Sequence, residues 1–150
     1  MKDYLDKVKN ELKRVDHLLY VSLKYTRTVD VIRSVINRLI SAFDFSIDGL
    51  LAKVKRRRKT LEIPEQPRKR CALVKELYAD DEKILDLIDF YLELRNIYQA
   101  KYTKREEYRR YVTLIAELEP GKTIDIGIDQ LHEYEKRTKT FVEYLEGVLK

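Results

Sequence analysis

This 150-residue chain is poor in the residue types that build redox, metal and membrane sites. It holds one cysteine, Cys71, so no disulfide can form within the chain, which suits a reducing compartment. Its two histidines, His17 and His132, stand far apart, and we expect neither a metal site nor a cofactor. No apolar run approaches the roughly 20 residues of a membrane span, and the first residues (MKDYLDKVKNELK) do not resemble a signal peptide. We therefore expect a cytoplasmic protein with no membrane partner.

The familiar catalytic motifs are missing as well. The four glycines are scattered, so no glycine-rich phosphate loop is present, and there is no serine elbow or Cys–His nucleophile pair. We expect Cys71 to be a small buried hydrophobic side chain. The acids between Asp80 and Asp86 could hold a divalent ion, but a helix start with a solvated face explains them better.

Charge is abundant and unevenly distributed. Charged residues make up 38% of the chain, and Asn, Gln, Cys and Met are scarce, a composition typical of thermophilic proteins. The segment Lys53–Arg70 holds nine basic residues against Glu62 and Glu65, a local charge of +7, while the rest holds 22 basic against 24 acidic residues. Clustered cations of this kind are typical of a surface that binds phosphate. The alternative is a helix end, whose dipole favours cations, followed by a solvated loop.

Apolar residues recur at helical spacing through most of the chain. The pattern predicts a first helix over residues 3–24 and a second, capped by Thr28, that runs to about Lys59. A linker with two prolines follows at Thr60–Pro67, and a short helix covers about residues 68–78.

A central helix, Ile84–Tyr102, follows the helix-start residues Asp80 and Asp81, and a last helix runs from the cap Asp129 to about Leu149. We therefore predict a single domain over residues 1–150, mainly α, built as an antiparallel up-and-down bundle of four to five helices.

The segment after Tyr102 changes period. Residues 111–118 are rich in β-branched and aromatic types, and residues 122–128 alternate cleanly. Pro120-Gly121 between them fits a type II turn. We predict a β-hairpin over about residues 110–129 that packs on the bundle or on a second copy, because a lone hairpin is only marginally stable. Thr103 and Glu106 could instead form the capping box of another helix.

Arg95 is the leading candidate for a functional residue. Arg95 and Asn96 follow the most apolar part of the central helix. An unpaired buried guanidinium costs several kcal/mol, so Arg95 must reach solvent, a carboxylate or a bound anion. Cations and tyrosines alternate after it, and arginine binds phosphate while tyrosine stacks on bases: Tyr98, Lys101, Tyr102, Lys104, Arg105, Tyr108, Arg109, Arg110 and Tyr111. The alternative is a core helix with half-buried tyrosines, whose cations pair with Glu93, Glu106 and Glu107.

The layout of residues 4–102, with the motif LELRN at the end of the core helix, resembles the HEPN superfamily. That resemblance implies a small helical bundle, and many such bundles are metal-independent RNases of toxin–antitoxin and defence systems. In the family an Arg, often followed by Asn, stabilises the phosphate across a dimer interface, and a His four to six residues later acts on the 2′-OH. The resemblance also implies a homodimer and an antitoxin-like or nucleotidyltransferase-like partner.

This chain departs from the family motif because Ala100, Lys101 and Tyr102 stand where the histidine belongs. Lys101 could replace the charge but not an acid–base group with a pKa near 7. We therefore expect a non-catalytic HEPN-like protein associated with RNA or nucleotides. The expected contacts are Arg95, Asn96, Lys101, Tyr102, Arg56, Arg57, Arg58, Arg68, Lys69 and Arg70. The alternatives are a metal-independent RNase that uses Arg95 with Lys101 or Tyr102, and a structural module whose basic segment meets an acidic protein.

Overall fold

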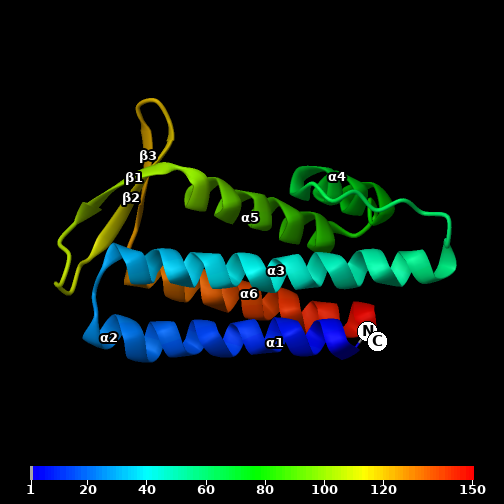
Figure 1. The fold of residues 1–150 in the computed structure, drawn as a ribbon, viewed down its shortest axis with the longest axis horizontal. Coiled ribbons are helices and arrows are strands. Elements are labelled where there is room, and N and C mark those ends of the chain that lie inside the picture. Colours follow the sequence, from blue (N-terminus) through cyan, green and yellow to red (C-terminus); the bar gives the residue numbers. More distant parts are fainter. Residues whose placement is uncertain (1) are drawn as a thin grey trace.

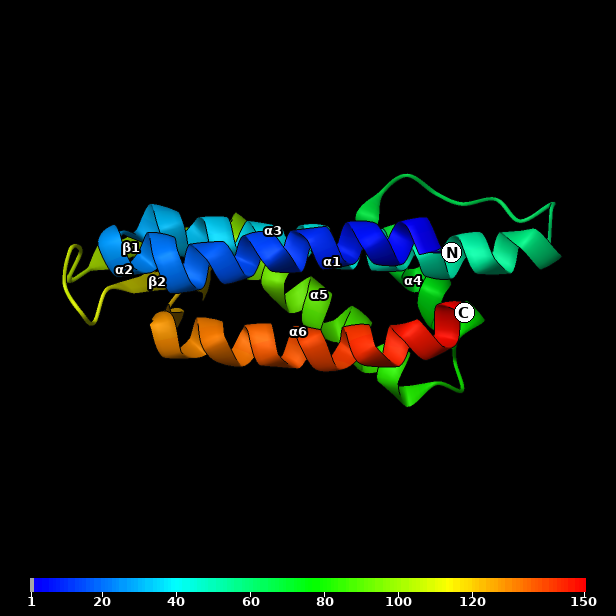
Figure 2. The same cartoon turned by 90° about the horizontal axis from the view of Figure 1, so that it is seen from below.

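The fold is mainly α, as the apolar periodicity predicts, and the computed structural model describes residues 2–150. Its long helices are α1 (Lys2–His17), α3 (Val29–Arg57), α5 (Glu82–Gln99) and α6 (Ile128–Leu149). They lie side by side and alternate in direction, and both ends of the chain lie at the same end of the bundle (Figure 1). Seen after a turn of 90°, α1 and α3 form one layer and α6 lies apart from it (Figure 2). Within residues 2–150, no helix is both long and apolar enough to cross a membrane.

Helix α3 is the centre of the bundle and packs against α1, α5 and α6. Its sequence explains this, because apolar residues occupy two adjacent positions in most turns and so cover more than one face. Phe43 joins three of the helices: its ring centroid lies 5.6 Å from that of Phe90 on α5 and 6.1 Å from that of Phe141 on α6. All three rings meet at steep or tilted angles, the arrangement that aromatic quadrupoles favour.

The first predicted helix is interrupted near its end. After α1 the chain forms a π-helical turn (Leu18–Ser22) and then the short α2 (Leu23–Tyr25). The side chain of Thr28 accepts a hydrogen bond from the Val31 N–H at 3.4 Å, which confirms it as the cap of α3. Glu107 adds a second acceptor, 2.9 Å from the Val29 nitrogen. The segment around Glu107 is thereby tied to the start of α3.

The predicted short helix is α4 (Pro67–Leu77), which lies outside the bundle beside α3 and α5 (Figure 1). Pro67 stands in its first turn, where the missing N–H removes no hydrogen bond. Residues at its start contact the end of α5, and Lys75 near its end pairs with Asp89 at 2.5 Å. The two helices are therefore antiparallel.

The predicted hairpin is confirmed as β2 (Thr113–Glu119) and β3 (Lys122–Ile126), with Gly121 at φ 78° in the turn. The prediction of a hairpin alone was incomplete, because β1 (Lys101–Arg105) pairs with β2 and completes a three-stranded antiparallel sheet. Thr103 lies within β1, so the proposed capping box was wrong. Only Tyr102 of β1 is half-buried, so this strand carries almost no apolar signal and depends on hydrogen bonds to β2.

The cap of the last helix also differs from the prediction. Gly127, rather than Asp129, is the N-cap of α6, and the Gln130 side chain accepts a hydrogen bond from the Gly127 N–H at 2.9 Å. Asp129 lies in the first turn instead, where its charge still favours the helix dipole.

The start of α5 gives a first testable prediction. Asp81 accepts hydrogen bonds from the Ile84 N–H at 3.1 Å and from the Tyr144 hydroxyl of α6 at 2.5 Å. We expect Asp81→Ala to lower the free energy of unfolding by about 1–2 kcal/mol, because it removes a cap and an interhelical bond together. Urea unfolding measures this. The exposed neighbour Asp80→Ala is the control, expected within about 0.5 kcal/mol of the unaltered protein, and equal losses for the two variants would contradict the assignment.

Candidate functional site

Arg95 and Asn96 lie in the last turns of α5, between the buried residues Leu94 and Ile97. Arg95 is half-buried and Asn96 is exposed. The guanidinium carbon of Arg95 lies 5.7 Å from the centroid of the Tyr91 ring, one turn earlier on the same face. Across residues 2–150 no salt bridge to Arg95 is formed, so no carboxylate neutralises it directly.

The carboxylate whose pKa the charge of Arg95 lowers is that of Asp44 on α3. The Tyr91 hydroxyl donates to Asp44 Oδ1 at 2.5 Å. Burial raises the pKa of Asp44, and the Tyr91 hydrogen bond and the charge of Arg95 offset part of that rise. Burial and the bond to Asp44 also raise the pKa of the Tyr91 phenol, so Tyr91 remains a donor near neutral pH. Arg95 therefore acts on Asp44 through space and keeps its own donors for another partner.

Helix α4 brings part of the basic segment to this position. Arg68 Nη2 donates to Asn96 Oδ1 at 3.3 Å, although the two residues are far apart in sequence. Arg68 and Lys69 are exposed, and within residues 2–150 neither forms a salt bridge. The two features that the sequence marks separately, the Arg-Asn pair and the cations after the linker, are thus parts of one surface. We refer to Arg68, Lys69, Arg95 and Asn96 as the α4–α5 surface.

Arg70, in contrast, is already occupied. It donates to the carboxylate of Asp48 on α3 and to the Pro64 carbonyl, the latter at 3.2 Å. Asp48 and Arg70 line a pocket of about 240 Å³, together with Asp44, Glu65 and Tyr91. Three carboxylates in its wall make this pocket unfavourable for phosphate. No metal-binding cluster of His, Cys, Asp or Glu is found in the part of the chain that the structure describes.

The basic segment is divided by the fold. Arg56 and Arg57 end α3 and Arg58 follows as its C-cap; all three are exposed. They lie roughly 12–15 Å further along the α3 axis than Asp48, the partner of Arg70. These three cations are therefore not part of the α4–α5 surface. Their place at a helix C-terminus agrees with the helix-dipole explanation as well as with binding.

Lys101 and Tyr102 are not near Arg95 either, because the chain has left α5 and entered β1. Tyr102 instead packs on Arg33 of α3, whose guanidinium carbon lies 4.8 Å from its ring centroid and 4.4 Å from that of Tyr98. Arg33 also donates to the Tyr98 carbonyl at 3.0 Å. Sequence reasoning missed Arg33, since nothing local pairs a residue of one helix with tyrosines of another.

The alternating cations and tyrosines of residues 98–111 separate into two groups. Tyr98 and Tyr102 are half-buried, as the core-helix alternative expects, whereas Tyr108 and Tyr111 are 77% and 65% exposed. Lys104 pairs with Glu107 at 3.5 Å, and Arg105 pairs with Asp125 at 3.1 Å. Tyr108 and Tyr111 thus belong to a different part of the surface from Tyr98 and Tyr102.

Cys71 is buried and free, as expected from the sequence. Burial raises the pKa of its thiol to about 11. The thiol is therefore protonated near neutral pH and is not a candidate nucleophile.

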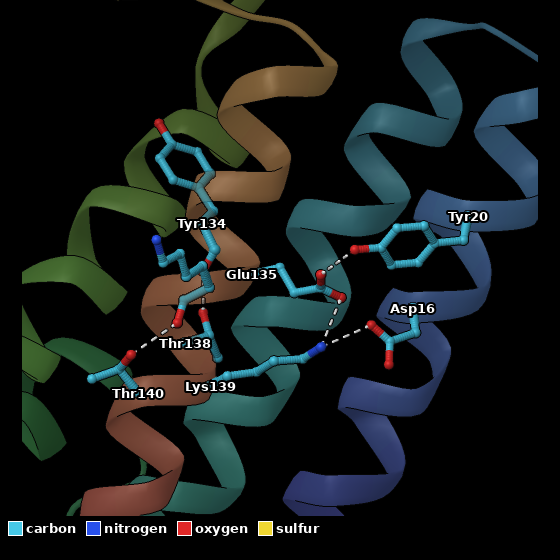
Figure 3. Close-up of polar contacts among 8 residues, drawn as sticks. Asp16, Tyr20, Tyr134, Glu135, Thr138, Lys139 and Thr140 are labelled. Atoms are coloured by element: carbon cyan, nitrogen blue, oxygen red, sulfur yellow. Dashed lines mark hydrogen bonds and ion pairs between the residues drawn. The ribbon is translucent and has the colours of Figure 1, made fainter.

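A polar network around the buried Glu135 joins α1 and α6, and sequence reasoning missed it (Figure 3). Glu135 lies on the apolar stripe of α6 and is only 3% exposed. The Tyr20 hydroxyl donates to Glu135 Oε1 at 3.4 Å, and Lys139 Nζ lies 3.1 Å from Asp16 Oδ1 and 3.7 Å from Glu135 Oε2. Tyr20 comes from the π-helical turn, which points it toward α6 (Figure 3).

The pKa values of the two carboxyl groups in this network are shifted in opposite directions. Burial and a hydrogen bond to Asp16 raise the pKa of Glu135 to about 7. The hydrogen bond from Glu135 and the nearby Lys139 hold the pKa of Asp16 below its usual value. Because Glu135 is almost fully covered, we assign the network to the joining of α1 and α6 rather than to ligand binding.

Comparisons with family models, with curated proteins and with solved structures find no match to this chain. The HEPN resemblance therefore stays a prediction.

Proposed function

We propose that this chain is a non-catalytic, HEPN-like helical protein that associates with RNA or nucleotides through Arg95 and the basic segments. The observation that carries the proposal is the contact between Arg68 and Asn96, at 3.3 Å, which joins cations of the basic segment to the Arg-Asn pair. Arg95 and Arg68 together present guanidinium donors, the group best suited to phosphate oxygens.

The position of these cations in α4 supports a bound anion. Arg68, Lys69 and Arg70 fill the first turn of α4, which holds no acidic residue, and Gln66 offers no side-chain cap. Cations at a helix N-terminus are disfavoured by the helix dipole by about 0.3–1 kcal/mol each. Asp48 compensates Arg70 only. A phosphate beside Arg68 and Lys69 would relieve the remaining repulsion.

The non-catalytic part of the proposal rests on the missing imidazole. The positions where the family motif has histidine hold Ala100, Lys101 and Tyr102, and Tyr102 packs on Arg33 instead of Arg95. His132, which belongs to α6, lies against Tyr20 of the π-helical turn, with 5.3 Å between the ring centroids. An RNase that uses Arg95 with Lys101 or Tyr102 is the alternative, and incubation of the protein with mixed RNA separates the two. Cleavage that is lost in Arg95→Ala would contradict the non-catalytic reading.

A salt titration tests phosphate binding. We expect the double variant Arg68→Gln, Lys69→Gln to bind a labelled single-stranded RNA about tenfold more weakly near 100 mM salt, with the slope of log affinity against log salt reduced by about 1.4. The matched control is Lys13→Gln, Lys136→Gln, which removes the same charge from exposed positions on α1 and α6. If both double variants weaken binding equally, only net charge matters and the α4–α5 surface is not the site.

The triple variant Arg56→Gln, Arg57→Gln, Arg58→Gln tests the other basic cluster. Weaker RNA binding with an unchanged melting temperature would include this cluster in the interface. A lower melting temperature with unchanged affinity would instead support the helix-dipole explanation. No binding by the unaltered protein at about 50 mM salt would end the RNA proposal and favour an acidic protein partner.

The remaining expectations come from the resemblance and from the composition, and they are part of the proposal. They are a homodimer, an antitoxin-like or nucleotidyltransferase-like partner, and a cytoplasmic location. Sedimentation of the purified chain tests the first of these, and recovery of complexes from cell extract tests the second.

A further inference from the structure

The end of the bundle opposite the chain termini carries an unusual concentration of exposed aromatic side chains. The β1–β2 loop and the turn between α2 and α3 meet there, and both views show them at the same end (Figures 1 and 2). The Tyr108 N–H donates to the Arg27 carbonyl at 2.6 Å and joins the two segments. Tyr25, Tyr108 and Tyr111 are 79%, 77% and 65% exposed, the highest values among the large hydrophobic residues that the structure describes. Aromatic faces left in water at one place are typical of an interaction surface.

The charge of this surface is positive. Arg109 and Arg110 are exposed, and within residues 2–150 neither forms a salt bridge. The loop also contains two acids: Glu106 is exposed, whereas the carboxylate of Glu107 accepts a hydrogen bond from the Val29 N–H at the start of α3. The cations are thus left facing solvent. We refer to Tyr25, Arg27, Tyr108, Arg109, Arg110 and Tyr111 as the loop surface.

A hollow of about 520 Å³ adjoins the loop surface, and Arg27, Arg110 and Tyr111 are among the residues that line it. The guanidinium of Arg110 lies 5.5 Å from the centroid of the Tyr111 ring. The Nε atom of Arg27 is buried and has no hydrogen-bond partner among residues 2–150. Buried donors nearly always have a partner, so this unpaired nitrogen is unusual. Asp125 and Asp129 line the hollow as well, and Asp125 is paired with Arg105.

The backbone of the loop holds Tyr108 in an unfavourable conformation. Glu106 and Tyr108 have φ values of 53° and 66°, in the left-handed region that bulky residues seldom adopt. Asparagine or glycine would fit this backbone better. An exposed tyrosine kept in such a conformation gains nothing from packing. Strain of this kind concentrates at binding sites.

We propose that the loop surface binds unpaired bases of single-stranded RNA, which stack on Tyr108 and Tyr111 while Arg27, Arg109 and Arg110 contact the phosphates. The proposal rests on the RNA association proposed above and assigns the class of RNA. Val29, beside this surface, and Asp44, beside Arg95, are about 15 residues apart on α3, or roughly 22 Å along its axis. One extended strand of several nucleotides can therefore contact the loop surface and the α4–α5 surface together.

The test compares two oligonucleotides of equal length, a uridine 12-mer and its abasic ribose-phosphate counterpart. We expect the uridine strand to bind more tightly, and Tyr108→Ala, Tyr111→Ala to weaken its binding by at least tenfold without changing binding of the abasic strand. Tyr108→Phe, Tyr111→Phe keeps both aromatic faces and is expected to bind as the unaltered protein does. Arg68→Gln, Lys69→Gln is expected to weaken binding of both strands alike, because it removes only phosphate contacts.

The possible outcomes separate the two proposals. If the tyrosine variants bind the uridine strand normally while the Arg68, Lys69 variant does not, the loop surface is wrong and the α4–α5 proposal stands. If the double tyrosine-to-alanine variant loses affinity for both strands equally, the bases do not stack on these tyrosines, and the loop-surface proposal is wrong. If the unaltered protein binds neither strand at about 50 mM salt, both proposals fall.

The variant Tyr108→Asn distinguishes a role of Tyr108 in binding from a role in the fold, because melting temperature and RNA affinity are measured on the same variant. Asparagine tolerates positive φ, and the replaced ring is mostly exposed, so we expect an unchanged or higher melting temperature. We expect the same variant to lose affinity for the uridine strand. A lower melting temperature with normal RNA affinity would show that Tyr108 serves the fold, and would overturn its role in binding.

Discussion

Phe43→Ala is expected to lower the free energy of unfolding by about 3–5 kcal/mol, because it empties the point where three helices meet. The Phe43 ring is fully buried and lies against Phe90 and Tyr91 of α5 and Phe141 of α6. For a domain of this size the loss corresponds to a fall of roughly 10 °C in melting temperature. Urea and thermal unfolding followed by circular dichroism measure it.

Phe45→Ala is the matched control for this variant. Phe45 is on the same helix but half-buried, with the Lys7 ammonium 5.6 Å from its ring centroid. We expect it to cost about 1 kcal/mol, since less apolar area leaves the core. Equal losses for the two variants would show that the aromatic cluster does not centre on Phe43.

The protein is expected to be more stable near pH 5 than near pH 8, by roughly 2–3 kcal/mol, through Glu135. The pKa of Glu135 is about 7 in the fold and near its usual value of 4.5 when unfolded. A raised pKa means that the folded state holds the proton more tightly, so this stability is full below about pH 4.5 and is lost as the pH rises through 7. Asp16, whose pKa is lowered, contributes in the opposite sense, and its stability is lost on further acidification. Melting temperature against pH measures both limbs.

Glu135→Gln isolates this effect. The amide imitates the protonated acid, so we expect the variant to be more stable than the unaltered protein near pH 8 and to lose most of the decline between pH 5 and pH 8. Glu133→Gln removes the same charge from an exposed position of α6 and serves as the control. A decline of unchanged size in Glu135→Gln would mean that another group is responsible, and Asp44, whose pKa burial also raises, is the next candidate.

The loop surface lies at the start of α3, beside Val29, and the α4–α5 surface lies at the end of α5. Between them, Arg33 lies against Tyr98 and Tyr102 along the contact between α3 and α5. Arg33, Asp44 and Asp48 fall within about 60° of one another around α3, so the polar residues follow one side of the helix.

The helices and the hairpin could be predicted because their signals are local. Apolar spacing, the caps Thr28 and Asp81 and the Pro120-Gly121 turn each act within a few residues. Strand β1 could not be predicted, because Tyr102 is its one half-buried residue and its partners on β2 lie 8 to 16 residues further along the chain. The π-helical turn was not predicted either, because it leaves the apolar stripe of the first helix largely intact.

By itself the sequence determined that this protein is a helical bundle with a β-hairpin and that its positive charge is concentrated, because periodicity and composition are properties of neighbouring residues. Only the tertiary structure decided which cations share a surface. It placed Arg68 on Asn96, joined Arg70 to Asp48 and left Arg56, Arg57 and Arg58 at a different helix end. It also placed Glu135 beside Asp16 and Tyr108 beside Arg27. Such pairings join segments far apart in the chain, and no local pattern can encode them because they depend on how whole helices pack.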